Sequence, residues 1–307
     1  HPEQDAEMTL VIDVGTNAEI VLGNKDRMLV CSTPTGPAFE GAQISSGQRA
    51  TFGAIERVRV DRETLEPRFK IIGSDLWSDE PGFEQALGSI GVTGICGSGI
   101  IEAVAEMFLA GIVSEDGVIN GALAEQSSRI FSSGRTWSFT LHTASPDGQS
   151  DISVTQNDIR QIQLAKAALY AGVKLLQDHM GTQHIDRIRL AGAFGSHISL
   201  SHAMVLGLIP DCPLKNVSAA GNAAGMGARI ALLDRDSRGH IEKIVRWAER
   251  IETAVEDKFQ DYFVDAMAFP HKSDPFTHLF AEIPPPVVRT QQAEAGNSRR
   301  RRGRTRS

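Results

Sequence analysis

The sequence predicts an α/β fold in which a mixed β-sheet is flanked by helices. Two apolar runs, residues 10–12 and 20–22, surround a Gly-Thr-Asn turn and predict an antiparallel hairpin. Residues 185–203 have the order strand, glycine turn and helix, which is typical of a parallel α/β unit. Residues 155–180 carry apolar side chains at helical spacing. A hairpin beside a strand–turn–helix unit gives a sheet with both antiparallel and parallel strands.

Length and composition place the chain among globular proteins. Its 307 residues suffice for one or two domains, and no apolar run approaches the roughly 18 residues that cross a bilayer. The net charge is −7, but residues 291–307 carry +5, which leaves −12 for the rest of the chain. An acidic body argues against a nucleic-acid-binding face. We therefore expect no membrane partner and no specific nucleic-acid partner.

The three cysteines, Cys31, Cys96 and Cys212, are isolated along the chain. They form none of the spacings that hold an iron–sulfur cluster or zinc. Reduced thiols are the simplest interpretation, because disulfides are rare in the cytoplasm, and we expect a cytoplasmic protein. The histidines form no H-E-x-x-H pattern, so we interpret His197 and His202 as loop or packing residues.

The opening hairpin is the first candidate site. Its first strand delivers Asp13 to a turn formed by Gly15, Thr16 and Asn17. Gly15 lets the backbone approach a phosphate, and consecutive amides in such a turn form a concave anion site. Asp13 fits beside a phosphate only if Mg²⁺ or its water shell lies between them. An ordinary hairpin with Asp, Gly and Asn as turn formers remains open on these residues alone.

The next elements follow in order. Residues 28–31 predict a third strand that completes an antiparallel meander. Residues 33–47 are rich in Pro and Gly and predict a shaped loop that leads into a short helix. Residues 55–60 and 69–72 predict a β-hairpin across a charged turn.

Residues 94–108 change from a glycine-rich turn to a helical period, with Ser98 as the expected N-cap. The free amides at the start of such a helix can bind an anion. We favour close packing as the reason for the glycines, because the segment lacks the Lys-Ser/Thr pair of a P-loop. We interpret residues 111–150 as loop-like, with one strand at 137–141.

Residues 155–180 give the strongest helix pattern in the chain. Thr155 and Asp158 form a start that resembles a capping box, and Gly181 is the expected stop. Lys166 falls off the main apolar stripe, so we expect its side chain to be in solvent.

A second glycine turn lies within residues 185–203. Gly192 and Gly195 bracket this turn at the carboxyl end of the expected strand, where ligands collect in α/β sheets. The spacing of two glycines is a weak signal by itself. If the opening hairpin and this glycine turn form one site, Asp13 must lie close to residues 192–195.

The last third of the chain combines small-residue and amphipathic segments. Residues 221–233 predict a helix whose small side chains suit close packing against another helix. Residues 240–256 predict two amphipathic segments, and residues 262–269 predict a strand that closes the folded part. Residues 284–307 keep few apolar side chains and are predicted to form a disordered Arg-rich tail.

The order of these pieces is more specific than any one of them. Together they resemble the C-terminal region of the reductive activators of corrinoid-dependent enzymes, in the segments VIDVGTNAEIVLG, GPAFEGAQISSG, GICGSGIIEAVAEMF, TQNDIRQIQLAKAAL, LAGAFGSHI and GLIP with GNAAGMGAR. The resemblance implies a ribonuclease H-like mixed sheet with flanking helices, which is the second lobe of an actin-like ATPase, plus an α/β insert at roughly 55–155. We expect one such domain at 1–283, followed by the tail at 284–307.

The resemblance also implies a function. The resemblance implies a protein with two functional parts. An N-terminal [2Fe–2S] domain supplies an electron, and a C-terminal ATPase drives the reduction of a corrinoid protein from Co(II) to Co(I). ATP and Mg²⁺ are the implied cofactors, and the corrinoid protein of a methyltransferase system is the implied partner. The [2Fe–2S] cluster is expected only on an N-terminal region. Because this sequence starts at His1 without that region, we expect a C-terminal fragment that is inactive in isolation.

Carried over by position, the resemblance assigns roles to individual residues. Asp13 is the expected catalytic residue and would hold Mg²⁺ through water. The expected nucleotide-binding residues are Gly15, Thr16 and Asn17 at the β- and γ-phosphates, Gln163 and Lys166 at the adenine, and Gly192, Ala193 and Gly195 at the adenosine. Ala18 and Ala193 stand where the family pattern has glycine, and each added methyl group narrows the approach of a ligand.

Two functions of other classes remain open. The chain would be a non-catalytic docking module if the alanine substitutions have ended nucleotide use. It would be a small-molecule kinase of the same superfamily if it carried a catalytic base and a substrate pocket, which the sequence does not reveal. A homodimer also remains open.

Overall fold

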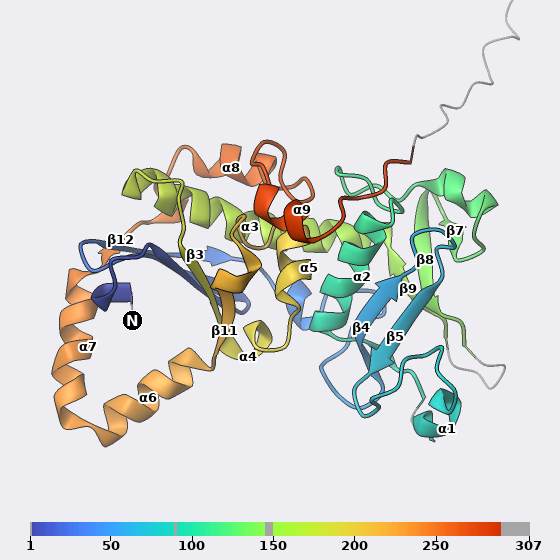
Figure 1. The fold of residues 1–307 in the computed structure, drawn as a ribbon, viewed down its shortest axis with the longest axis horizontal. Coiled ribbons are helices and arrows are strands. Elements are labelled where there is room, and N and C mark those ends of the chain that lie inside the picture. Colours follow the sequence, from blue (N-terminus) through green and yellow to red (C-terminus); the bar gives the residue numbers. More distant parts are fainter. Residues whose placement is uncertain (1, 89–90, 145–149, 290–307) are drawn as a thin grey trace, which may run out of the picture.

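The computed structural model describes residues 2–88, 91–144 and 150–289. A mixed sheet and its covering helix lie in the middle of the molecule, with an α/β insert on one side and an arm of two helices on the other (Figure 1). The predicted α/β class is confirmed. None of the described helices combines the length and the apolar composition that a membrane crossing needs.

Within the described residues, the main sheet has six strands in the order β11-β10-β1-β2-β3-β12. They are β1 (Thr9–Val14), β2 (Asn17–Gly23), β3 (Met28–Pro34), β10 (Arg187–Ala191), β11 (Val217–Gly221) and β12 (Glu249–Arg250). Strands β1, β2 and β3 are antiparallel, whereas β10 runs parallel to β1 and β11 parallel to β10. The predicted meander and the mixed sheet are therefore confirmed.

Helix α3 (Gln156–Met180) covers the meander. It starts with the predicted capping box of Thr155 and Asp158 and ends at Gly181, whose φ is +75°. Gly172 faces the sheet so closely that a Cβ there would lie 2.6 Å from Cγ2 of Thr33 and 2.8 Å from Cδ1 of Ile20. The helix therefore rests directly on β2 and β3.

The insert holds two small sheets of three strands each, counted over the described residues, and Figure 1 shows it beyond α3. Its elements are β4 (Ala54–Val60), β5 (Pro67–Ile71), α1 (Phe83–Leu87), β6 (Gly94–Ile95), α2 (Gly97–Leu109), η3 (Gly121–Glu125), β7 (Ile130–Ser133), β8 (Thr136–His142) and β9 (Ile152–Thr155). The predicted hairpin is β4–β5. The loop-like interpretation of 111–150 is wrong in part, because that stretch also holds η3 and β7, which are too short to show a periodic pattern.

The glycines that open α2 pack tightly, as predicted. A Cβ on Gly97 would lie 1.9 Å from the carbonyl oxygen of Phe39, and one on Gly99 would lie 2.1 Å from that of Ile55. The expected N-cap is wrong, however. Cys96 occupies the N-cap position without a side-chain cap, and Ser98 lies inside the first turn, where it is buried.

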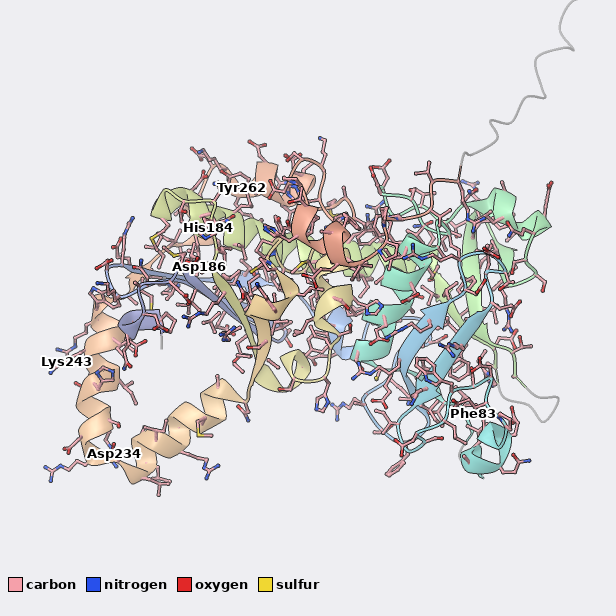
Figure 2. All side chains as sticks on the ribbon, in the orientation of Figure 1. Phe83, His184, Asp186, Asp234, Lys243 and Tyr262 are labelled. Atoms are coloured by element: carbon pink, nitrogen blue, oxygen red, sulfur yellow. The ribbon has the colours of Figure 1, made fainter. Side chains whose placement is uncertain are left out.

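The C-terminal part departs most from expectation. Helix α6 (Ala223–Leu233) has no buried residue, so the predicted close packing of its small side chains is wrong. It leads into α7 (Arg235–Trp247), and the two form a helical arm that turns at Asp234, with side chains such as that of Lys243 standing away from the sheet (Figure 2). We call α6 and α7 the helical arm.

The expected strand at 262–269 is also wrong. That region contains α8 (Phe259–Asp265), which packs on α3 with its aromatic side chains partly buried. Helix α9 (Thr277–Glu282) follows. Residues 284–289, expected in the tail, instead bond to the end of α2: the amide of Val287 donates to the carbonyl of Leu109 at 3.0 Å. Residues 290–307 of the expected tail lie outside the described residues.

Candidate functional site

Two sequence motifs meet at one edge of the main sheet. Because β1 and β10 are parallel, their carboxyl ends lie together, and Asp13 is paired with Ala191 across the ladder. Gly192 follows with φ +84°, a conformation that favours glycine. A Cβ on Gly192 would lie 2.3 Å from Oδ1 of Asp13. The opening hairpin and the second glycine turn therefore form a single site.

The carboxylate of Asp13 has no partner among the residues that the structure describes. Its side chain is half-buried at the end of β1, and within the described part of the chain it accepts no hydrogen bond and forms no ion pair. A partly buried carboxylate without a partner is costly unless a cation or water compensates it. The donor set fits Mg²⁺, which is usually held by one or two carboxylates while it keeps several waters.

The β1–β2 turn is tighter than the sequence suggested. The amide of Gly15 donates to the carbonyl of Asn17 at 3.0 Å, so it is not free for a ligand. The Thr16 amide donates to no other described residue, and Thr16 and Asn17 are exposed. The turn therefore presents one free amide at Thr16 and the polar side chains of two residues.

A loop after β3 braces this turn. The hydroxyl of Thr35 lies 2.6 Å from the carbonyl oxygen of Gly15 and 3.1 Å from that of Thr16, and the amide of Gly36 donates to Thr16 as well. The hydroxyl of Thr16 donates to Oε1 of Glu40 at 2.9 Å. Sequence reasoning missed Thr35 and Glu40, although the Pro- and Gly-rich composition of their loop was the available signal.

Aromatic packing joins that loop to the glycine turn. Glu40 ends η2 (Ala38–Glu40), and Phe39 stacks on Phe194 of α4 (Gly192–Gly195) with ring centroids 5.7 Å apart and planes at 19°. A Cβ on Gly195 would lie 3.1 to 3.2 Å from atoms of Leu190, so the turn lies close against β10. The base of the site is thus made by β1, β10, η2 and α4.

Gln163 and Lys166 lie in another environment. Nε2 of Gln163 donates to the carbonyls of Asp116 at 3.1 Å and Met267 at 2.8 Å. The amine of Lys166 donates to the carbonyls of Ala268 and Pro270. Among the described residues, neither side chain bonds to the β1–β2 turn or to α4, so the structure does not bring them to the edge where Asp13 lies.

The burial of Lys166 differs from the expectation. We expected it in solvent, but it is fully buried, and its amine lies 5.4 Å from the ring centroid of Phe269. Burial lowers the pKa of the amine well below its usual value. The helical stripe failed to predict this because the segment at 267–270 covers the face of α3 that lies away from the sheet.

The cysteines do not form a metal centre. All three thiols are free and buried, and no group of three or more metal-ligating side chains occurs over 2–88, 91–144 and 150–289. Burial raises the pKa of the Cys31 thiol to about 12 and, with nearby acids adding to it, that of Cys212 to about 11. Such thiols are poor metal ligands, because the thiolate is the ligating form.

The sheet order and this edge define a class of protein. An antiparallel meander followed by parallel strands, with an acid and a glycine turn at the shared edge, is the lobe of an actin-like (ASKHA) ATPase. The chain belongs to the family described as the C-terminal domain of RACo, the ASKHA domain, whose family model matches residues 7–280. The predicted family and fold are thereby confirmed.

Relatives carry names that agree with this family. The corrinoid activation enzyme RamQ of Eubacterium limosum is 36% identical over 274 residues, which is 86% of this chain and 43% of the relative. The [Co(II) methylated amine-specific corrinoid protein] reductase of Methanosarcina barkeri is 26% identical over 283 residues, 86% of this chain and 46% of the relative. The chain therefore spans less than half the length of these curated relatives.

A solved structure gives the same result. The reductive activator for corrinoid, iron-sulfur protein superposes with a TM-score of 0.76 at 36% identity, over 92% of this chain and 42% of that chain. The actin-like fold thus agrees between the sequence and the three-dimensional comparison.

Proposed function

We propose that this chain is the nucleotide-binding lobe of an ATP-dependent reductive activator that returns Co(II) corrinoid proteins to Co(I). The observation that carries the proposal is the carboxylate of Asp13 against Gly192, unpaired among the described residues, in a chain whose relatives are named as corrinoid activators and reductases. The partner we propose is the corrinoid protein of a methyltransferase system, in the cytoplasm. The homodimer stays a prediction.

The residues at the sheet edge have distinct roles in this proposal. Asp13 holds Mg²⁺ through water, and the ion offsets the charge between that carboxylate and the phosphates. The free amide of Thr16 and the exposed side chain of Asn17 meet the phosphates, beside the backbone of Gly15. The backbone from Gly192 through Ala193 to Gly195 takes the adenosine. Gln163 and Lys166 act elsewhere, because carbonyls at 267–270 occupy their donors.

ATP drives the activator by changing the balance between two conformations. A ligand shifts such a balance only by its differential affinity for the two states. The edge described here grips a nucleotide from one side only, so a second lobe must supply the other contacts. We therefore expect this chain alone to bind ATP weakly and a protein with both lobes to bind it tightly and hydrolyse it slowly.

The electron comes from outside this sequence. A [2Fe–2S] cluster needs four ligands, and this chain has three cysteines, all buried. The residues present do not fit the cluster, so no step of the reaction is assigned to them through it. We propose that the cluster lies on an N-terminal region of the complete activator.

Calorimetric titration tests the proposal. MgATP is titrated into this chain and into the complete activator, which has both lobes and the cluster, and reduction of Co(II) corrinoid protein by the activator, with dithionite as the electron source, is followed by visible absorption. Weak binding by the first and ATP-dependent formation of Co(I) with the second are expected. Tight binding by this chain alone would contradict the two-lobe model, and reduction that ignores ATP would contradict the ATPase role.

A docking module that no longer uses nucleotide is the second candidate. The observation that favours it is the engagement of Thr16 by Glu40, which occupies a hydroxyl expected to face phosphate. A pull-down with the corrinoid protein, with and without ATP, separates the two. Binding that is unchanged by ATP indicates the docking module.

A further inference from the structure

Glu102 of α2 is a buried acid that collects three donors from strand β4. Its side chain is 1% exposed, and its Oε1 accepts from Nη1 of Arg57 at 3.0 Å. Its Oε2 accepts from the amide of Val58 at 3.0 Å and from Nη1 of Arg59 at 2.5 Å. A buried charge is costly unless it is paired and hydrogen-bonded, and here both oxygens have partners. The acid therefore fixes both arginines on the insert.

Arg57 also reaches out of the insert. The same Nη1 atom donates to the carbonyl oxygen of His197 at 2.9 Å. His197 lies two positions after Gly195, the last residue of α4. Its amide donates to the carbonyl of Phe194 at 3.0 Å, and the amide of Ile198 donates to the same carbonyl at 3.3 Å. One nitrogen atom of Arg57 therefore joins the buried acid to the end of the second glycine turn.

Two further contacts hold this turn and the helix that follows it. The aromatic stack on η2 holds Phe194 within the turn. In α5 (Leu200–Val205), which lies beside α2 in Figure 1, Nε2 of His202 lies 2.8 Å from Oε1 of Glu106 on α2. Between these two contacts, the bond from Arg57 is the one hydrogen bond to the insert among the described residues. Its loss would release the backbone directly after the turn.

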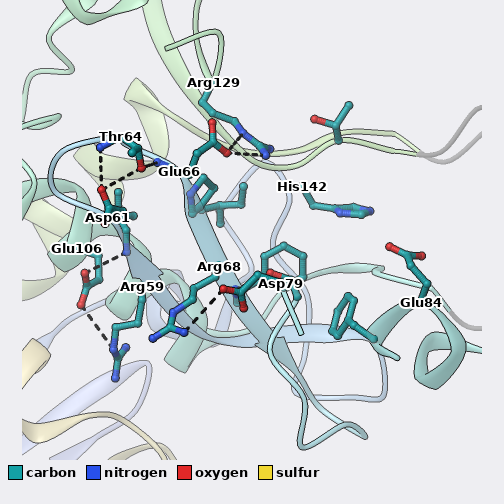
Figure 3. A pocket seen from close by; sticks show the side chains of 17 residues that line it. Arg59, Asp61, Thr64, Glu66, Arg68, Asp79, Glu84, Glu106, Arg129 and His142 are labelled. Atoms are coloured by element: carbon teal, nitrogen blue, oxygen red, sulfur yellow. Dashed lines mark hydrogen bonds and ion pairs between the residues drawn. The ribbon is translucent and has the colours of Figure 1, made fainter. Parts of the chain in front are cut away.

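Arg59 shares the acid with Arg57 but does not contact the turn. Its Nε lies 3.8 Å from Oε1 of Glu106, at the side of a cavity in the insert (Figure 3). Its guanidinium lies 5.8 Å from the ring centroid of Trp77. Within the described part of the chain, it bonds to no residue of 192–205. Arg57 and Arg59 are 33% and 38% exposed, so the bond to His197 is the main difference between them.

We propose that Arg57, oriented by Glu102, positions the second glycine turn for the nucleotide, so that the insert sets the affinity for ATP. The inference rests on the proposed function and names a residue that supports the same site. Arg57 is a positioning residue, because it bonds to the backbone just beyond the segment that takes the adenosine. Binding is weaker when a site must be ordered as the ligand enters, and a support that is fixed beforehand removes this cost.

A matched pair of variants in the complete activator tests the inference. Arg57→Gln should raise the dissociation constant and the KM for MgATP about tenfold, because a hydrogen bond from a charged group is lost. Its kcat should change by less than about twofold, since the lost support affects ground state and transition state alike. Arg59→Gln removes the other cation of Glu102 and should leave all three constants within about twofold of the wild type. Calorimetric titration and a phosphate-release assay measure them.

A rescue and a stability control separate positioning from folding. Both bonds of Arg57 come from one nitrogen atom, so the amine in Arg57→Lys can make both, and this variant should bind MgATP within about threefold of the wild type. Arg57→Gln and Arg59→Gln each leave Glu102 with one cation. Urea unfolding should therefore show similar losses of stability for these two variants.

Hydrogen exchange gives a second measurement, on this chain without nucleotide. The amides of His197 and Ile198 should exchange about tenfold faster in Arg57→Gln than in the wild type, because the backbone after the turn opens more often. In Arg59→Gln the exchange of these amides should match that of the wild type. Unchanged exchange in Arg57→Gln would overturn the inference.

The outcomes distinguish this inference from the function on which it rests. If Arg57→Gln binds MgATP as tightly as the wild type does, the inference is overturned and the proposed function stands. If Arg57→Gln and Arg59→Gln weaken binding equally, the effect comes from the loss of a cation at Glu102, and the positioning role of Arg57 is overturned. If the wild-type activator itself does not bind MgATP, the proposed function fails and the inference fails with it.

Discussion

The carboxylate of Asp13 fills the space that a side chain on Gly192 would need. The two residues belong to segments almost 180 positions apart, yet the parallel pairing of β1 and β10 brings them to one edge. Gly192 has φ +84°, a conformation that favours glycine, and a Cβ added there would clash with Asp13. The backbone conformation and the close approach of Asp13 therefore both require glycine at this position. The acid and the glycine turn therefore constrain each other, and either can be used to test the site.

Gly192→Ala should destabilise the chain and impair the site. The left-handed backbone alone costs an alanine about 1 kcal/mol. The clash of the new Cβ with Asp13 adds to this, so we expect a loss of about 2–3 kcal/mol in the free energy of unfolding. Gly181→Ala is the matched control, because Gly181 has φ +75° and no atom within 4 Å of an added Cβ. Urea unfolding measures both.

A double variant isolates the contact. In an Asp13→Ala background the Cβ of Gly192→Ala no longer meets a carboxylate, so the cost of Gly192→Ala should fall to that of the control. An equal cost in both backgrounds would show that the carboxylate and the turn are not in contact.

Asp13→Asn should weaken Mg²⁺-dependent nucleotide binding without destabilising the fold. The carboxylate has no partner in the described part of the chain, so the free energy of unfolding should change by less than about 0.5 kcal/mol. Loss of a group that orders metal-bound water lowers metal affinity about 10–100-fold. Titration of ATP with and without Mg²⁺ measures this in a protein with both lobes. Asp26→Asn, in the exposed β2–β3 turn, should behave as the wild type does.

The sequence allowed the hairpin and the glycine turn to be predicted because both are local patterns. Two short apolar runs define β1 and β2, and glycine marks each turn, Gly15 in the first and Gly192 and Gly195 in the second. The hairpin and the glycine turn depend on short segments, so one sequence suffices to find them. The parallel pairing of β1 with β10 was not itself predicted from the sequence; the hypothesis required only that Asp13 lie close to the second glycine turn, and the pairing brings the two together.

The errors concern residues whose environment is set by distant segments. Lys166 was expected in solvent because its helix pattern says nothing of the residues at 267–270 that cover it. Helix α6 was expected to pack because its residues are small, yet no described segment covers it. Thr35 and Glu40 brace the β1–β2 turn from a loop whose composition predicts a shape but not its contacts. Tertiary partners, not local propensity, decide each of these cases.

His271 should make stability depend on acid pH. Its Nδ1 accepts from the amides of Ser273 and Asp274, and its buried Nε2 has no partner in the described structure. Burial lowers its pKa from 6.5 to about 4, although Asp274 opposes the shift. Between these values the unfolded chain binds the proton and the folded chain does not, so stability falls as the pH is lowered. The loss should be roughly 1–3 kcal/mol across that window.

His271→Asn tests this prediction, because it keeps an acceptor for the two amides and cannot titrate. Urea unfolding of both proteins at a series of pH values should give a steeper fall for the wild type between pH 6.5 and about 4. Subtracting the variant's curve of unfolding free energy against pH from that of the wild type removes the contribution of the other histidines. Parallel curves would show that His271 titrates normally in the folded chain.

The helical arm should contribute little to the stability of this chain. Leu232 and Leu233 are 74% and 78% exposed, and α6 has no buried residue. Leu233→Ala should therefore change the free energy of unfolding by less than about 0.5 kcal/mol, whereas Leu176→Ala in α3, where the side chain is 0% exposed, should cost about 2–5 kcal/mol. Thermal unfolding at two protein concentrations measures both effects. A large loss of unfolding free energy in Leu233→Ala that does not depend on protein concentration would mean that α6 packs on the body of its own chain. The exposed position of the helical arm would then be wrong.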